Sequence, residues 1–257
     1  MSKSDLTNRK LKIVGIGGGT GLSTLLRSLR TKPVDLYAII TVADNGGSSG
    51  RLRKEYGILP PGDFRNCLVA LSDAEPLLKE LFQYRFESTS ALNGHSFGNL
   101  FIMAMEKITG SFDEAIKESS KVLNVTGQLI PSTLDQVNLV AELKDGKIVE
   151  GENEITNSNS SIIDIKLKPS DPKPSIKALK AIQSSDAIVI GPGSLYTSII
   201  PNLLISEIIE EINKTNNPVI YICNIATQLG ETTDYNAVSH LETIQKIIPK
   251  LKITSIL

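Results

Sequence analysis

Glycine-rich segments follow the apolar runs of this chain, and this arrangement restricts the fold more than any other feature. Leu11–Ile16 (LKIVGI) is an apolar run that leads into Gly17–Gly21, and the leucines after it recur at helical spacing. A second apolar run, Asp35–Ala43, comes next. Short apolar runs that end in glycine are typical of buried parallel strands. The two runs and the helix between them predict a right-handed βαβ unit.

The pattern changes near residue 124. Residues 62–123 show helical spacing, with Ser111 and Glu114 at the positions of a capping box. From residue 124 to 170 apolar and polar residues alternate, and Asp145-Gly146 lies between two strand-like runs. Such a pair indicates a two-residue hairpin. We therefore expect an antiparallel β insert over residues 124–170.

A second α/β half follows the insert. Strand-like runs at Asp186–Ile190 and Pro218–Asn224 alternate with helical segments, the last of which contains His240. This predicts one α/β domain over residues 1–257, a Rossmann-like three-layer sandwich with a mostly parallel sheet. Residues 251–257 resemble a strand without a following element, so we expect a C-terminal element that is missing here. The amphipathic pattern of the last helix places His240 at the surface.

Composition excludes several classes of protein. The formal net charge of −1 gives no basic excess for nucleic acid. No apolar run has membrane-spanning length, and the N-terminal MSKSDLTNRK lacks the apolar core of a signal peptide. Cys67 and Cys223 are far apart and outside any C-x-x-C spacing, which indicates reduced thiols. We expect a cytoplasmic protein without membrane insertion.

Four polar segments leave the carboxyl ends of predicted strands: residues 17–21, 44–51, 191–198 and 224–232. Ligands of open parallel sheets bind at that edge. The first segment fits neither the dinucleotide fingerprint nor the Walker pattern. Its backbone N–H groups at a helix N-terminus nevertheless suit phosphate. We expect phosphate or pyrophosphate binding there, and the alternative is a tight turn that needs glycine only for packing.

Asp44 is the first acidic candidate. It lies where dinucleotide enzymes place the acid that binds ribose, and it could also hold Mg²⁺ with phosphate oxygens. The alternative is an Asx turn that stabilises the start of the loop. The donors of the following NGGSSG and the charge of Arg51 favour a ligand role.

Two further polar clusters precede apolar helices: PPGDFRN, with Asp63 and Asn66, and GHSFGN, with His95, Ser96 and Asn99. For His95 a structural hydrogen bond and a substrate contact both remain open. No Ser-His-Asp order and no histidine cluster for zinc is present. The residues therefore give no evident catalytic machinery.

Six motifs together resemble the bacterial gluconeogenesis factor family, which is related to 2-phospho-L-lactate transferase. They are GIGGGTGLSTLLRSL, TVADNGGSSGRLR, LPPGDFRNCLVAL, GHSFGNLFI, GPGSLYTSIIPNLL and NIATQLGET, and they cover nearly the whole chain. The resemblance implies a Rossmann-like core that binds a UDP-sugar, such as UDP-N-acetylglucosamine or UDP-glucose. It also implies a cytoplasmic role in cell shape and envelope synthesis during growth on gluconeogenic carbon sources. The related transferases are dimers, so a homodimer is one expectation.

The resemblance also assigns residues to the ligand site. Contacts are expected from Gly17, Gly18, Gly19, Thr20, Gly21, Asp44, Asn45, Gly46, Gly47, Ser48, Ser49, Gly193, Ser194, Leu195, Tyr196, Asn224, Thr227 and Gln228. The third group, residues 193–196, is expected to face the diphosphate. The transferase relatives use a divalent metal, so Asp44 is the expected position for Mg²⁺, although no cofactor is required for binding alone.

Three functions remain open. The first is a non-catalytic nucleotide-sugar sensor that acts through unidentified protein partners. The second is a transferase of a nucleotidyl-linked group, with Asp44 and Mg²⁺ stabilising charge on a diphosphate. The third is an NAD(P)-binding protein, which the broken G-x-G-x-x-G pattern disfavours.

Overall fold

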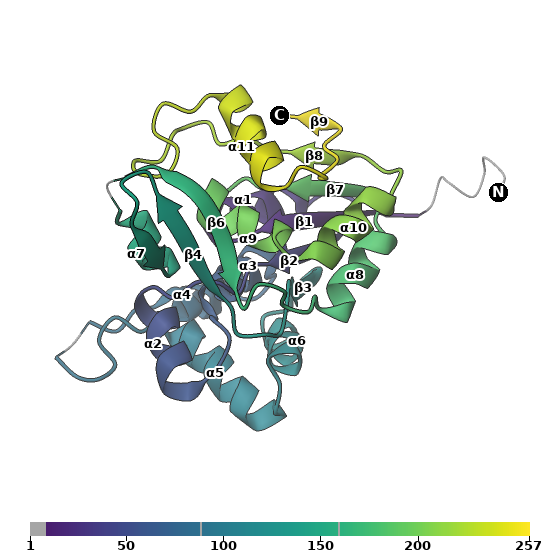
Figure 1. Ribbon diagram of the computed structural model, residues 1–257. Helices are drawn as coiled ribbons and strands as arrows, with labels where there is room; N and C mark the ends of the chain where they lie inside the picture. The colour runs from purple at the N-terminus through teal and green to yellow at the C-terminus, as the bar shows by residue number, and fades with distance from the viewer. Residues whose placement is uncertain (1–8, 88, 159) are drawn as a thin grey trace.

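The computed structural model describes residues 9–87, 89–158 and 160–257, arranged around a central six-stranded sheet (Figure 1). The spatial order is β3-β2-β1-β7-β8-β9, and every neighbouring pair is parallel. The strands are β1 (Leu11–Gly17), β2 (Val34–Ile40), β3 (Gln128–Pro131), β7 (Ala187–Ile190), β8 (Val219–Tyr221) and β9 (Ser255–Ile256). When these six strands are renumbered from 1 to 6 in chain order, their spatial order is 3-2-1-4-5-6, which is that of dinucleotide-binding folds. The predicted α/β fold with a parallel sheet is confirmed.

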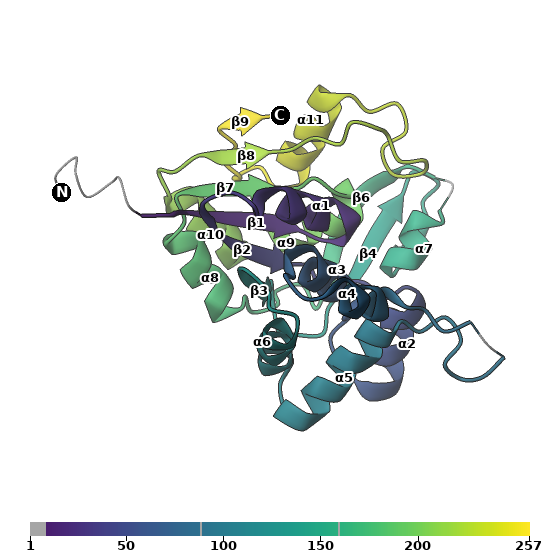
Figure 2. The same cartoon turned by 180° about the vertical axis from the view of Figure 1, so that it is seen from behind.

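Helices cover both faces of this sheet. On one face lie α1 (Gly19–Leu29) and α3 (Gly62–Leu71), which Figure 2 shows in front. On the other lie α8 (Ile176–Gln183), α10 (Ser206–Lys214) and α11 (Ala237–Ile247), seen in front in Figure 1. Of the remaining helices of the first half, α6 (Phe112–Val122) packs beside β3. α4 (Pro76–Gln83) and α5 (Phe97–Thr109) pack on α3, and α2 (Gly47–Tyr56) packs on α5. The layers are therefore helix, sheet, helix.

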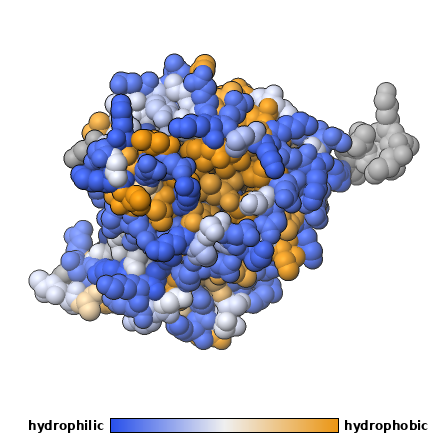
Figure 3. Space-filling view, in the orientation of Figure 1, coloured by the Kyte–Doolittle hydropathy of each residue, from blue (hydrophilic) through white to orange (hydrophobic). Residues whose placement is uncertain are grey.

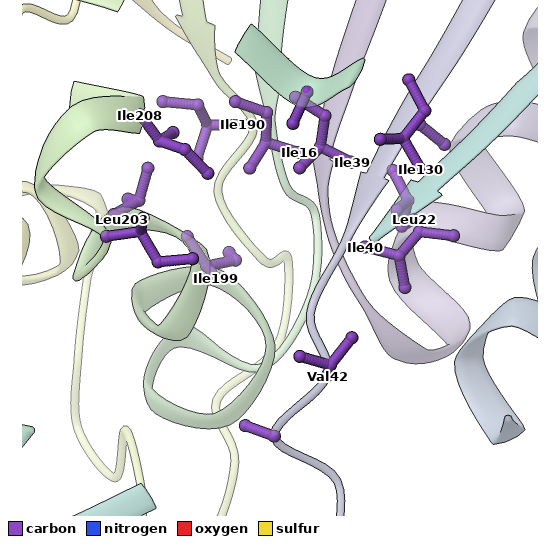
Figure 4. Packing of buried hydrophobic residues seen from close by; sticks show 14 of the residues in the cluster. Ile16, Leu22, Ile39, Ile40, Val42, Ile130, Ile190, Ile199, Leu203 and Ile208 are labelled. Atoms are coloured by element: carbon purple, nitrogen blue, oxygen red, sulfur yellow. The ribbon is translucent and has the colours of Figure 1, made fainter. Parts of the chain in front are cut away.

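The central strands β1, β2 and β7 are largely buried, as their continuous apolar sequence predicts, whereas the edge strand β9 is exposed. Ile16, Ile39 and Ile190 are fully buried, and Figure 4 shows them beside Leu203 and Ile208 from the covering helices. Each such side chain contributes about 1.5–3 kcal/mol when it leaves water. This packing fixes the strand ends, and with them the positions of the loops at the carboxyl edge.

The antiparallel insert forms a separate small sheet of order β5-β4-β6. Its elements are β4 (Asn138–Leu143), β5 (Ile148–Glu150), α7 (Glu152–Thr156) and β6 (Ile162–Lys168). The predicted hairpin is present, but its loop has three residues, 144–146, and not two. The N–H of Leu143 bonds the carbonyl of Lys147, and Gly146 has φ 83° whereas Asp145 does not have the positive φ of a two-residue type I′ turn. The face of the molecule in Figure 3 is apolar where this insert meets α9 (Ile200–Leu203) and α10.

Three further details differ from the sequence predictions. β3 pairs in parallel with β2 in the main sheet, so the insert begins after β3 and not at residue 124. A helix, α2, begins at Gly47, where a loop was expected, and Gly47 itself has φ 45°. His240 is 2% exposed, because it lies one turn before the buried Ile244 on the inner side of α11.

The predicted N-cap at Ser111 is confirmed, since its side chain accepts from the N–H of Glu114. Among the described residues, every helix is too short or too polar to cross a bilayer.

Candidate functional site

A pocket of about 640 Å³ opens at the carboxyl ends of β1, β7 and β8. The direction of strand succession reverses between β1 and β7, which is where open α/β sheets bind their ligands. The volume lies within the usual range for small-molecule sites. Its walls come from Gly18–Gly21, from Pro192, Gly193, Ser194, Thr197 and Ser198, from Ile222–Gln228, and from Glu152 and Thr156 of α7. Three of the four predicted polar segments therefore line one cavity.

The N-terminus of α1 forms one end of this pocket. Gly18 is its N-cap in extended conformation, without a side chain that could cover the first turn. The N–H groups of the first turn have no partner within a helix, and the helix dipole makes this end positive. Gly19, Thr20 and Gly21 of this turn all line the pocket. This end suits an anionic group.

Gly21 lets the segment after β1 (residues 18–21, the β1 loop) touch the backbone of the segment after β7 (residues 191–198, the β7 loop). The segment after β8 (residues 222–232) is called the β8 loop in the same way. A Cβ atom at Gly21 would lie 2.3 Å from the carbonyl oxygen of Pro192 and 2.8 Å from the Cα of Gly193. Real Cβ contacts are never so short, so this contact requires glycine. Gly17, which was also expected to touch the ligand, ends β1 and is buried outside the lining.

The β7 loop presents a different set of residues from the one expected. Leu195–Ile199 form a π-helical turn, η1, in which Leu195 and Tyr196 are 0% and 2% exposed. The expectation that these two side chains face the ligand does not match the structure, because the wide turn directs them into the core. Thr197 and Ser198 line the pocket in their place.

Asn224 connects the β8 loop to the β7 loop. Its Nδ2 donates to the carbonyl of Gly193 at 2.8 Å, and its Oδ1 accepts from the N–H of Gly193 at 3.1 Å. Both polar atoms of the side chain are thus used within the protein. Thr227 and Gln228 line the pocket as expected from the sequence.

Three carboxyl groups, those of Asp44, Asp63 and Glu152, lie close together beside the N-terminus of α1. Asp63 Oδ2 is 2.5 Å from where a Cβ of Gly18 would stand, so the carboxyl lies against the β1 loop. Burial, together with the charge of Asp44, raises the pKa of Asp63 to about 7, while the N–H of Gly19 opposes the rise. Burial and then the charges of Asp44 and Asp63 raise the pKa of Glu152 to about 9. Mutual repulsion of these groups is the common feature.

Asp44 makes the Asx turn that was the alternative interpretation of this residue. Its Oδ1 accepts from the N–H of Gly46 at 2.8 Å, and its backbone carbonyl accepts from Arg53 at 3.0 Å. Its Oδ2 points toward the start of α3, 3.3 Å from where a Cβ of Gly62 would stand. One carboxylate oxygen therefore has a structural role.

The rest of the Asp44–Arg51 segment supports the pocket from outside. Asn45 accepts from the N–H of Asn153 at 3.0 Å and donates to Glu154 at 3.1 Å, which holds α7 against the site. Residues 45–51, including Gly46, Gly47 and Arg51, are absent from the pocket lining. Arg51 instead donates to the carbonyl of Asn93.

A buried polar cluster lies behind this segment. Ser48 Oγ is 2.9 Å from His95 Nδ1 and accepts from Asn99 Nδ2 at 3.1 Å, and each of these three side chains is at most 5% exposed. Burial lowers the pKa of His95, which favours its neutral form. Of the two open interpretations of His95, the geometry shows the structural hydrogen bond.

The neighbouring candidates are also used internally. Ser49 Oγ accepts from the N–H of Gly62 at 3.1 Å, and Ser96 caps α5 through the N–H of Asn99 at 3.3 Å. Asn66 accepts from Arg65 at 2.9 Å. Ser48, Ser49, Asn66, His95, Ser96 and Asn99 therefore do not line the pocket, and their contacts position the loops around it.

Sequence reasoning missed two acids of the site. Glu152 lines the pocket from α7, and Glu231, 4% exposed, accepts from Ser194 of the β7 loop. Both are single acids in polar segments, which carry no local pattern. Only the position of Glu231 within NIATQLGET, beside candidates Thr227 and Gln228, could have drawn attention to it.

A comparison with protein families identifies the relatives of this chain. The family model described as 2-phospho-L-lactate transferase CofD matches residues 13–257. The chain belongs to the CofD family. This confirms the resemblance inferred from the six motifs, and the matched range includes every segment of the pocket.

Individual relatives refine the placement within the CofD family. A protein named gluconeogenesis factor from Halalkalibacterium halodurans is 54% identical over 236 residues, which are 92% of this chain and 73% of the relative. Another of that name from Bacillus subtilis is 52% identical over 93% of this chain and 75% of its own length. A Nostoc sp. protein, named as a candidate gluconeogenesis factor, is 56% identical over 93% of this chain. This chain spans only 53% of that protein's length.

A solved structure shows the same fold. The crystal structure of a member of the UPF0052 family from Bacillus halodurans superposes with a TM-score of 0.93 at 51% sequence identity. The match covers 96% of this chain and 80% of that chain.

Proposed function

We propose that this CofD-family chain binds a nucleotide sugar, such as UDP-N-acetylglucosamine or UDP-glucose, in the pocket at the carboxyl ends of β1, β7 and β8. We further propose that it is a cytoplasmic regulatory protein, needed for cell shape and envelope synthesis during gluconeogenic growth, that acts through protein partners. The relatives named gluconeogenesis factor support the link to gluconeogenic growth, and the role in cell shape and envelope synthesis is what the resemblance of the motifs implies. The pocket supports the ligand.

One observation carries the proposal of a diphosphate ligand. The N-terminus of α1, whose N-cap is a glycine, opens into a pocket at the switch point of the sheet, where Thr20 and Gly21 of its first turn line the surface. The N–H of Gly19 already bonds the carboxyl group of Asp63, so Thr20 and Gly21 are the candidate donors. Donors at the positive end of a helix dipole are a usual protein site for phosphate.

The opposite wall suits an uncharged part of a ligand. Ile222, Ile225 and Ala226 of the β8 loop present apolar surface, and Ile225 is fully exposed. Ligand pockets are lined mostly by apolar side chains with a few polar groups that fix orientation, and such apolar surface suits the flat face of a nucleobase. We therefore assign the pocket an anion-binding end and an apolar end. A nucleotide diphosphate needs both.

A second candidate function is a transferase that uses Mg²⁺, and the repulsion between Asp44 and Asp63 favours it. Among the described residues, no three His, Cys, Asp or Glu side chains form a preassembled metal site. Mg²⁺ needs only one or two carboxylates when phosphate oxygens complete its shell. Asp44 and Asp63 would hold it, and the ion would neutralise charge on a diphosphate.

Calorimetric titration separates these functions. UDP-N-acetylglucosamine, UDP-glucose, GTP and NADH are titrated with and without Mg²⁺, and each mixture is then analysed by chromatography for products. The proposal expects saturable binding of a UDP-sugar without turnover. Turnover would favour the transferase, preference for NADH would favour an NAD(P)-binding protein, and absence of UDP-sugar binding would contradict the proposal.

A further inference from the structure

Three hydrogen-bond acceptors surround a single hydroxyl group on one wall of the pocket. Ser194 Oγ lies 3.0 Å from Gln228 Oε1, 3.2 Å from Glu231 Oε1 and 3.1 Å from Glu231 Oε2. A serine hydroxyl has one proton and donates to one acceptor at a time. The hydroxyl proton can therefore serve only one of these three oxygen atoms at a time.

Glu231 is 4% exposed and keeps room for a ligand donor. Besides Ser194, its carboxylate accepts from Thr156, whose Oγ1 lies 3.4 Å from Oε1, and from the backbone N–H of Tyr196. A carboxylate has about four acceptor sites, so these three donors do not fill it. Among the ion pairs of the described residues, none involves Glu231. Burying a carboxyl group is costly even with these donors, and burial raises the pKa of Glu231 while the three donors oppose the rise. Additional donors from a ligand would lower that cost.

A second cavity lies beyond this wall and is lined by hydroxyl groups. It has about 510 Å³ and includes Glu231 together with Thr156, Ser158, Ser161 and Tyr235. Thr156 belongs to the lining of both cavities. A ligand that extends past Ser194 would thus meet hydroxyls and a carboxyl, and no cation.

Charge divides the roles of the two ends. A phosphate placed beside Glu231 would face an acidic group without a helix terminus, whereas one placed at the α1 N-terminus would meet the positive end of a helix dipole as well as the nearby carboxyl group of Asp63. Sugar hydroxyls are neutral donors, and a carboxyl oxygen accepts them well. The wall with Glu231 therefore complements a sugar, and the α1 end complements the diphosphate.

We propose that Ser194, Gln228 and Glu231 bind the hydroxyl groups of a sugar ring of the ligand, and that Glu231 determines the preference for ligands that carry them. This inference rests on the proposed nucleotide-sugar binding. The ring is either the ribose of the nucleotide or the hexose beyond the diphosphate, since both present adjacent hydroxyls.

The test measures dissociation constants of UDP-N-acetylglucosamine, UDP and 2′-deoxy-UDP by calorimetry. Wild type is compared with Glu231→Gln and with Glu242→Gln, an exposed acid of α11 that serves as the matched control. A ligand that lacks the recognised sugar hydroxyl groups should bind wild type about ten-fold or more weakly than the ligand that carries them. In Glu231→Gln this difference in affinity should fall to about three-fold or less, because a neutral amide is a weaker acceptor than a carboxylate. Glu242→Gln should behave as wild type.

The ligand pairs identify the ring. A penalty between UDP and 2′-deoxy-UDP that is lost in Glu231→Gln assigns the ribose, and one between UDP-N-acetylglucosamine and UDP assigns the hexose. Unchanged ratios in a folded Glu231→Gln overturn the inference while UDP-sugar binding stands. If wild type binds none of the three, the proposed function itself fails, and this inference with it. Should Glu231→Gln melt well below wild type, the half-buried Gln228→Leu provides the same ratios, with the same outcomes.

Discussion

Replacing Gly21 with alanine should push apart the two loops that form the anionic end of the pocket. The new Cβ would lie 2.3 Å from the Pro192 carbonyl oxygen, whereas an ordinary contact begins at 3.4 Å. The loops must therefore separate by about 1 Å, and both contacting groups are backbone, which cannot turn aside as a side chain can. A shift of this size at a phosphate site should weaken binding of UDP-N-acetylglucosamine about ten-fold or more, which corresponds to about 1.4 kcal/mol.

The cost in stability follows from two opposing effects. Overpacking against rigid neighbours destabilises by about 1–3 kcal/mol, and replacing a helical glycine with alanine recovers up to about 1 kcal/mol. A net loss of about 1–2 kcal/mol lowers the melting temperature by roughly 2–8 °C in a chain of this size. Thermal unfolding followed by circular dichroism measures this loss, and calorimetry measures the affinity.

Gly17→Ala is the matched control for Gly21→Ala. Its Cβ would meet Leu22 at 3.6 Å and Pro192 at 3.9 Å, which are ordinary contacts, and Gly17 lies outside the pocket lining. The control should melt within about 2 °C of wild type, since no group has to move. If Gly21→Ala matches the control in both melting temperature and affinity, the described contact between the β1 and β7 loops is refuted.

Three further changes test other parts of the site and fold. Asp44→Asn keeps the Asx turn but removes the charge, so binding of UDP-N-acetylglucosamine should lose any dependence on Mg²⁺, and an unchanged Mg²⁺ effect in calorimetry would exclude Asp44 as its ligand. Burial lowers the pKa of His240 below its ordinary 6.5. Because the unfolded chain then binds this proton more readily, stability falls as pH drops below about 6.5. In His240→Gln the drop in melting temperature from pH 7.5 to 5.5 should be smaller than in wild type, and an equal drop would show that other groups cause it. Leu195→Ala should lower the free energy of unfolding by about 2–5 kcal/mol in urea titrations, as a buried core residue does, whereas a loss below about 1 kcal/mol would indicate that the side chain faces the pocket.

The parts of this fold that sequence predicts are those with local causes. β1 and α1 follow from an apolar run, glycines and leucines at helical spacing, and each of these acts within a few residues. The position of the hairpin likewise follows from Gly146, whose positive φ suits a turn, although the loop has one residue more than predicted. Because parallel strands end at one edge, the meeting of the β1, β7 and β8 loops could also be expected before any coordinates.

The remaining parts depend on contacts between distant segments. α2 begins among glycines that disfavour helix, and α7 has five residues, too few to be stable alone. α7 is held in place by Asn45, about a hundred residues earlier in the chain. Spacing alone could not show this interaction. The burial of His240, by contrast, could have been predicted, since it shares a helical face with Ile244.

The candidate site divides in the same way. Glycines and Thr20 of the first segment line the pocket because the strand end places them there. Leu195 and Tyr196 do not, because a π-helical turn changes which side chains point outward by an amount that no propensity predicts. Ser48 and His95 have polar side chains suited to a ligand, yet they bind each other in the interior.

A crystal structure of the protein with bound UDP-N-acetylglucosamine is the most direct test of the proposed site. We predict phosphate oxygens within hydrogen-bond distance of the backbone N–H groups of Thr20 and Gly21. The uridine and the N-acetylglucosamine should lie between the β7 and β8 loops. A ligand bound at saturating concentration whose diphosphate lies away from the α1 N-terminus would contradict this placement.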